Sequence, residues 1–118
     1  MSTFTVSAIL GHPFRQEQAQ EFQLLVDTGA SYILLPPEIV DRLGLETRIE
    51  RRVMLASGEL VTYRLGDVYI RFNDEDHTTT FLAGPPGSRA LFGAYALELF
   101  SLAVDPVNQR LFPVPALL

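Results

Sequence analysis

Cysteine is absent from this chain of 118 residues, and histidine occurs only twice, at His12 and His77. Without cysteine the chain has no disulfide framework and no thiolate zinc site, and two isolated histidines make a poor metal-binding cluster. We therefore expect a fold that depends on packing alone, with no metal and no other cofactor.

Positive charge is scarce and long apolar runs are missing. The formal net charge is -5, so the field around the chain repels the phosphates of nucleic acid and of anionic lipid. No stretch approaches the ~20 apolar residues of a membrane span. Residues 11–15 also interrupt the apolar start that a secretory signal needs. We therefore expect no nucleic-acid partner, no membrane partner and a cytoplasmic location.

The overall balance of residues favours one folded domain. Hydrophobic residues make up 47% of the chain and charged residues 19%, which is typical of a packed globule and not of a disordered chain. A chain of this length buries roughly two-thirds of the surface that its unfolded form exposes. Because no linker or low-complexity stretch divides it, we expect residues 1–118 to form a single domain.

Most of the chain alternates between apolar and polar residues, which predicts strands. The pattern is clear in residues 4–8 and 22–26. The long run at residues 52–72 is expected to split at Ser57-Gly58, where glycine can adopt the positive φ of a tight hairpin, and again at Gly66-Asp67. Further short strands are predicted at residues 78–82, 102–104 and 110–114.

Two segments have helical spacing instead, at residues 37–43, just before Gly44, and at residues 94–100. Each follows a similar string, residues 24–29 in the first case and residues 90–93 in the second. The chain therefore resembles a weak internal duplication. Many short strands with two short helices predict an all-β barrel or sandwich.

The segment Leu25-Val26-Asp27-Thr28-Gly29-Ala30-Ser31 carries the chemistry. It delivers a carboxylate from an apolar strand onto a tight turn, which can hold the acid in one orientation. Asp-Thr-Gly is also ordinary turn chemistry on any surface. Here a second apolar strand, Ile33-Leu34-Leu35, follows the turn, and surface turns seldom have core on both sides. We therefore interpret Asp27 as a candidate reactive acid.

This segment resembles the active-site loop of retropepsin-like aspartic proteases. The likeness continues in the family's order, with a strand and short helix at residues 32–44 and a flap hairpin at about residues 52–64. The string Leu91-Phe92-Gly93 then precedes a last helix. The resemblance implies an all-β fold, a closed acid-protease (retropepsin-like) barrel with a flap hairpin and one or two short helices.

The same resemblance implies an aspartic endopeptidase that cleaves a polypeptide substrate. Two copies would form a homodimer in which the two Asp27 carboxylates share one proton and activate a water, without a cofactor. The implied catalytic residues are Asp27, Thr28 and Gly29. The implied substrate-binding residues lie in the same loop and at the flap tip, namely Ala30, Ser31, Ala56, Ser57 and Gly58.

The chain departs from the family in two places. Ser31 and Ala94 stand where retroviral enzymes have an acid and an arginine that form an ion pair, and losing both leaves no stranded charge. Retroviral dimers interleave their chain ends in one sheet, whereas Pro113 and Pro115 here cannot donate to such a ladder. A differently built dimer interface is expected, and residues 116–118 are either part of it or a frayed tail.

Other polar and aromatic clusters have simpler interpretations. Asp74-Glu75-Asp76-His77 is interpreted as a solvated turn and not as a metal site. A group of arginines is interpreted as solvated surface, namely Arg48, Arg51 and Arg52. A group of tyrosines is interpreted as core or sheet residues, namely Tyr63, Tyr69 and Tyr95.

Two other functions compete with proteolysis. A retropepsin-like domain without catalysis could serve as a dimerisation or peptide-binding module, and Asp27 argues against that. Phosphate-binding loops of the sugar-kinase and actin-like fold carry a similar Asp, Gly and Ser/Thr string. That architecture needs two large α/β lobes, which a chain of 118 residues with period-2 patterning does not supply.

Overall fold

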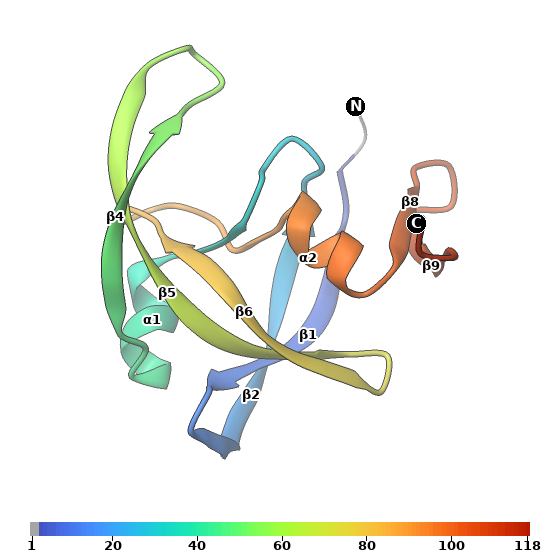
Figure 1. Ribbon diagram of the computed structural model, residues 1–118, viewed down its shortest axis with the longest axis horizontal. Coiled ribbons are helices and arrows are strands. Elements are labelled where there is room, and N and C mark those ends of the chain that lie inside the picture. The colour runs from blue at the N-terminus through green and yellow to red at the C-terminus, as the bar shows by residue number, and fades with distance from the viewer. Residues whose placement is uncertain (1–2) are drawn as a thin grey trace.

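A computed structural model describes residues 3–118 and shows a mainly β chain with two short helices (Figure 1). The strands are β1 Thr5–His12, β2 Arg15–Val26, β3 Ile33–Leu35, β4 Thr47–Met54, β5 Leu60–Phe72, β6 Glu75–Ala83, β7 Leu91–Phe92, β8 Leu102–Asp105 and β9 Arg110–Pro113. The helices are α1 Pro37–Leu43 and α2 Ala94–Leu99. The predicted all-β class with two short helices is confirmed.

The main sheet closes on itself. Its strands follow the order β1-β2-β7-β3-β6-β5-β4, and β1 also pairs with β5 through partners such as Leu10 and Ile70. Strands β1, β2, β7, β3, β6 and β5 thus form a ring, and β4 continues outward from β5. Closure pairs the edges that an open sheet would leave free, and it confirms the predicted closed barrel.

The alternation seen in the sequence places one face of each strand in the core. The most deeply buried large side chains all come from the strands of the ring, and are Leu10, Leu24, Ile33, Leu35, Val68, Ile70, Phe81 and Phe92. Their polar neighbours along β1 and β2 face outward. Because a one-residue slip would turn every apolar side chain toward solvent, this pattern sets the register of the pairs.

The predicted strand break at Gly66-Asp67 is wrong, because β5 runs without interruption through both residues. Gly66 is required for a different reason. A Cβ built at this position would lie 2.0 Å from the carbonyl oxygen of Glu46 and 2.8 Å from the ring of Phe81. The glycine therefore permits a close approach of two chain segments inside a continuous strand.

The predicted turn at Ser57-Gly58 is confirmed as the end of a long hairpin. Strands β4 and β5 pair from Met54 and Leu60 down to Thr47 and Gly66, and Gly58 has a φ of 88°. The amide of Leu55 donates to the carbonyl of Glu59 across the turn. In Figure 1 this hairpin, drawn in green, projects beyond the body of the molecule.

Helix α1 begins and ends as the sequence predicts. Pro37 occupies its first turn, and Gly44 ends it with a left-handed φ of 65°. Helix α2 ends at Leu99, one residue before the predicted end, and Gly93 precedes its first residue. Among residues 3–118, no helix is long and apolar enough to cross a membrane.

The predicted solvated turn at residues 74–77 is only partly right, because Asp74 lies in the β5–β6 turn whereas Glu75, Asp76 and His77 belong to β6. Asn73 and Asp74 have positive φ values of 50° and 65°, and no group of metal-ligating side chains is found among the described residues. The hydroxyl of the buried Tyr69 donates to Asp76 over 2.8 Å. This hydrogen bond, with burial, raises the pKa of Tyr69.

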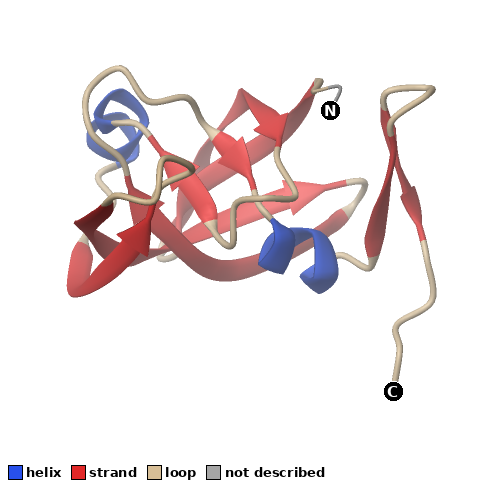
Figure 2. Cartoon of the chain, turned by 90° about the horizontal axis from the view of Figure 1, so that it is seen from above, coloured by secondary structure: helices blue, strands red, loops and turns tan. Residues whose placement is uncertain are grey.

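Strands β8 and β9 form a separate hairpin that follows α2, and Figure 2 shows it at one side of the main sheet. Asp105 stabilises the turn between β8 and β9. Its carboxylate accepts hydrogen bonds from the side chain of Asn108 over 2.8 Å and from the amides of Asn108 and Val107 over 3.2 Å. These bonds, the side chain of Asn108 first, lower the pKa of Asp105 below its ordinary 3.8.

The lowered pKa of Asp105 predicts how this hairpin depends on pH. A group whose pKa is lowered by folding contributes stability above its ordinary value, and that contribution disappears as the pH falls through the lowered pKa. We therefore expect Asp105→Ala to lower the melting temperature at neutral pH, with a smaller difference from the parent at about pH 2. Thermal unfolding at the two pH values measures this, and Asp41→Ala on α1 is the control.

Candidate active site

Asp27 emerges from the sheet where two similar strands lie side by side. Strands β2 and β7 are parallel, with Leu25 opposite Leu91 and Val26 opposite Phe92. The amide of Asp27 donates to the carbonyl of Phe92 over 3.1 Å. The two strings that look duplicated in the sequence are thus aligned in space, and they present Asp27 beside Gly93.

A tight turn holds the carboxylate of Asp27. Its Oδ1 accepts a hydrogen bond from the amide of Gly29 over 2.9 Å, and its carbonyl accepts one from Ala30 over 3.2 Å. A Cβ at Gly29 would come within 3.3 Å of the same Oδ1. Glycine at this position therefore leaves room for the carboxylate to bond to the backbone and still face the cleft.

Helix α2 anchors the rest of the loop through its first amides. Ala94 donates to the carbonyl of Ala30 over 2.7 Å, and Tyr95 donates to that of Ser31 over 3.0 Å. Ala94 and Ser31, the two positions where the retroviral pattern has an ion pair, each take part in one of these backbone bonds, although not with each other. The loop thus stays tied to α2 without a buried charge.

A cleft of about 760 Å³ lies between this loop and the β4–β5 hairpin. Its lining from the loop and nearby strands is Asp27, Gly29, Ala30, Ser31, Tyr32, Leu34, Leu82, Leu91 and Tyr95. Its lining from the hairpin is Arg51, Arg52, Val53, Met54, Leu55, Ala56 and Tyr63. Asp27 therefore faces a space large enough for several residues of an extended peptide.

The cleft gathers some of the predicted site residues and leaves others out. Asp27, Gly29, Ala30, Ser31 and Ala56 all line it. Three others do not, namely Thr28, Ser57 and Gly58. The last two lie at the hairpin tip, so contact with a substrate at that tip stays a prediction.

Several residues that line the cleft were not predicted as site residues from the sequence. Arg51 and Arg52 are exposed, as expected of solvated surface, but both also line the cleft. Tyr63 is a sheet residue as predicted, and Tyr69 is in the core. The same prediction is wrong for Tyr95, which is 57% exposed on α2 and also lines the cleft. Alternation along β4 and β5 could have indicated that Arg51 and Tyr63 share a face, but not which face covers Asp27.

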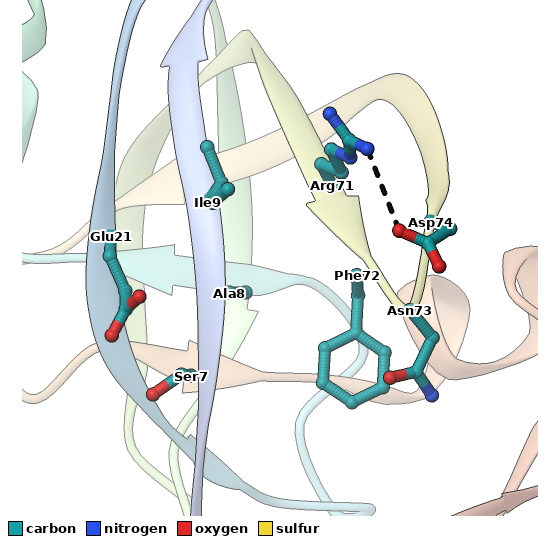
Figure 3. Close-up of a pocket in the computed structure, with 8 residues that line it drawn as sticks. All are labelled: Ser7, Ala8, Ile9, Glu21, Arg71, Phe72, Asn73 and Asp74. Carbon is teal, nitrogen blue, oxygen red and sulfur yellow. Dashed lines mark ion pairs between the residues drawn. The ribbon is translucent and has the colours of Figure 1, made fainter.

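A second hollow, of about 560 Å³, lies away from Asp27 between β1, β2 and the β5–β6 turn (Figure 3). Its charged groups are Glu21, Arg71 and Asp74, and Arg71 pairs with Asp74 at 3.6 Å. The only cation that lines it is therefore already partnered. This hollow offers an open polar surface and no converging reactive groups.

Comparison with known proteins connects this site to a family. A family model described as aspartyl protease matches residues 13–93. The comparison with curated protein sequences found no match.

Solved structures share the fold at low sequence identity. The EIAV protease in complex with the inhibitor HBY-793 has a TM-score of 0.63 at 17% identity, over 82% of this chain and 86% of that one. A retropepsin-like aspartic protease from Rickettsia conorii has a TM-score of 0.60 at 22% identity, over 88% of each chain. The retroviral protease-like domain of Ddi1 from Leishmania major has a TM-score of 0.62 at 13% identity, over 96% of this chain and 89% of that one.

Proposed function

Because the chain belongs to the retropepsin-like aspartyl protease family, we propose that it is an endopeptidase whose catalytic acid is Asp27. The observation that supports this most directly is the position of Asp27 in the cleft, with one carboxylate oxygen bonded to Gly29. A carboxylate that faced bulk solvent or was sealed in the core would not fit the proposal.

The proposed chemistry needs two copies of the chain. Each chain contains the Asp-Thr-Gly string once. In a homodimer two Asp27 carboxylates would meet, and at ~3 Å and an effective dielectric of ~20 two negative charges would repel by roughly 5 kcal/mol. The pair would therefore hold one proton between them.

Because the two carboxylates hold one proton, one of them can act as a general base and the other as a general acid. The ionised carboxylate takes a proton from a water as the water attacks the peptide carbonyl carbon. The protonated partner donates its proton to the carbonyl oxygen, which gives a tetrahedral intermediate with no net change in proton count. The β4–β5 hairpin would act as a flap that covers the peptide and excludes water.

The separate β8–β9 hairpin is the part of the chain that we assign to the dimer contact. A two-stranded sheet is marginally stable without further packing, and Leu102, Val104 and Leu111 of this hairpin are only partly buried against the core. Apolar side chains at its turn and after its last strand are exposed, namely Val107, Leu117 and Leu118. A second copy could cover them, which fits the interface alternative for the chain end.

A cleavage assay at several protein concentrations tests the proposal. We expect an unstructured polypeptide to be cut at mildly acidic pH, with a specific activity that rises with concentration and then levels off as dimers form. Sedimentation over the same concentrations should show the dimer fraction rising in parallel.

Two outcomes would contradict the proposal. A strictly monomeric protein that cleaves at full rate would remove the paired-carboxylate mechanism. A dimer that binds peptides and cleaves none would support the alternative of a catalytically silent peptide-binding module.

A further inference from the structure

We propose that Arg51 makes the cleft a binding site for a peptide carboxylate, so that the protein selects substrates with an acidic group near the cleaved bond. This inference rests on the proposed function for its consequence, because it assigns a substrate class to the same cleft. Its evidence comes from the position, the support and the unpaired charge of Arg51.

Arg51 lies in the part of the β4–β5 hairpin that lines the cleft. Arg51 lies directly opposite Tyr63, and Val53 lies opposite Val61. Side chains of directly opposed residues share one face of a sheet. Arg51, Val53 and Tyr63 all line the cleft that Asp27 faces. Arg52 and Met54, which alternate with Arg51 and Val53 along β4, line the cleft as well, so the strand pairing alone does not place the guanidinium. Its hydrogen bond to Tyr32, which also lines the cleft, places it there.

Two tyrosines hold Arg51 in relation to the Asp27 loop. Its Nη1 donates to the hydroxyl of Tyr32 over 3.0 Å. The ring of Tyr32 meets the ring of Tyr95 edge-on, with centroids 5.2 Å apart and an interplanar angle of 87°. The amide of Tyr95 is in turn bonded to Ser31. This chain of contacts orients the guanidinium and uses only one of its five N–H groups.

The charge of Arg51 has no carboxylate partner within the described part of the chain. Two other arginines of the β4–β5 hairpin are paired, Arg48 with Asp67 at 3.2 Å and Arg64 with Glu50 at 3.6 Å, whereas Arg52 has no ion pair among residues 3–118. The only acidic residue that lines the cleft is Asp27, whereas Arg51 and Arg52 both line it. On a chain with a net charge of -5 the cleft is thus locally basic.

A planar guanidinium with free donors matches a carboxylate better than any neutral group, because two parallel N–H groups can bond its two oxygens. That carboxylate could be a Glu or Asp side chain within the peptide or the carboxylate at its C-terminus. Aromatic and aliphatic side chains that line the cleft, such as Tyr63 and Leu91, would pack against the rest of the peptide. Because solvent and salt screen the charge of an exposed arginine, we expect the site to favour acidic over neutral peptides without binding them tightly.

Matched fluorogenic peptides test the inference. The set places Glu or Gln at each position beside the cut, and a second set carries the C-terminus as free acid or amide. We expect one Glu peptide or the free acid to be cleaved with about 10-fold higher kcat/KM than its neutral twin, and the two sets tell the two carboxylate sources apart. Arg51→Gln should remove the preference, and Arg51→Glu should reverse it, so that the neutral peptide is cleaved faster than its acidic twin.

Arg48→Gln is the matched control, since it removes the same charge from the same strand outside the cleft. It should keep the preference. Binding of the same peptides to Asp27→Asn by fluorescence anisotropy separates this inference from the proposed function. A carboxylate preference in binding, together with no cleavage of any peptide by the wild-type protein, would uphold the site and contradict the proposed peptidase. Cleavage or binding that is equal for acidic and neutral peptides, or unchanged by Arg51→Gln, would overturn the site.

Discussion

Asp27→Asn is expected to lower kcat/KM for peptide cleavage at least about 10³-fold. Asparagine has the same shape and can keep the hydrogen bond from Gly29, but it can neither take a proton from water nor share one with its twin. The melting temperature should stay close to that of the parent, because the side chain is replaced by one of equal volume. Initial rates with a single fluorogenic substrate measure the effect.

Mixing the two proteins sharpens this test. Excess Asp27→Asn chain should suppress limiting wild-type chain, because mixed dimers would hold one functional carboxylate only. Asp41→Asn is the matched control, since it removes one negative charge from the exposed face of α1, outside the cleft. Activity retained in Asp27→Asn, or wild-type activity unaffected by a large excess of it, would disprove the paired mechanism.

Gly93→Ala is expected to lower the free energy of unfolding by about 3 kcal/mol, and the melting temperature by on the order of 10 °C. A Cβ at this position would lie 2.3 Å from the carbonyl oxygen of Tyr32 and 2.8 Å from that of Ala30. Both are backbone atoms of the loop that follows Asp27, so the loop and α2 must separate. Peptide cleavage should fall as well, even where the variant is folded.

Gly58→Ala provides the comparison for this steric argument. Gly58 has a positive φ of 88°, and a Cβ added there would have no atom within 4 Å, so alanine meets backbone strain alone. We expect a cost of about 1 kcal/mol. Thermal and urea unfolding measure both variants. Equal stability losses in Gly58→Ala and Gly93→Ala would show that the close contact at Gly93 is relieved without cost.

The elements that could be predicted from the sequence are those with local causes. The alternation around Leu24 predicts a strand with one buried face, and Pro37 and Gly44 bracket α1 because their backbone preferences act within one turn. Gly66 shows the limit of this reasoning. Its sequence context resembles a turn, but the reason for glycine is the carbonyl of Glu46, which only the folded chain brings there.

The candidate site divides in the same way. The string around Asp27 carries its own turn chemistry, so the sequence identifies the acid, the glycine that bonds it and the family that uses them. The positions of Arg51 and Tyr95 depend on the pairing of β4 with β5 and on the docking of α2 against the loop. The residues next to Arg51 and Tyr95 in the sequence form no pattern that would predict the β4–β5 pairing or the docking of α2.

The sequence by itself determined the strand periodicity, the two short helices and the identity of the candidate acid, because each follows from free energies that act between near neighbours in the chain. Only the tertiary structure decided which strands close the sheet, that β2 and β7 align Asp27 with Gly93, and that Arg51, without a carboxylate partner among residues 3–118, lines the acid's cleft. Those features arise from contacts between distant segments, whose partners are chosen by the packing of the whole core.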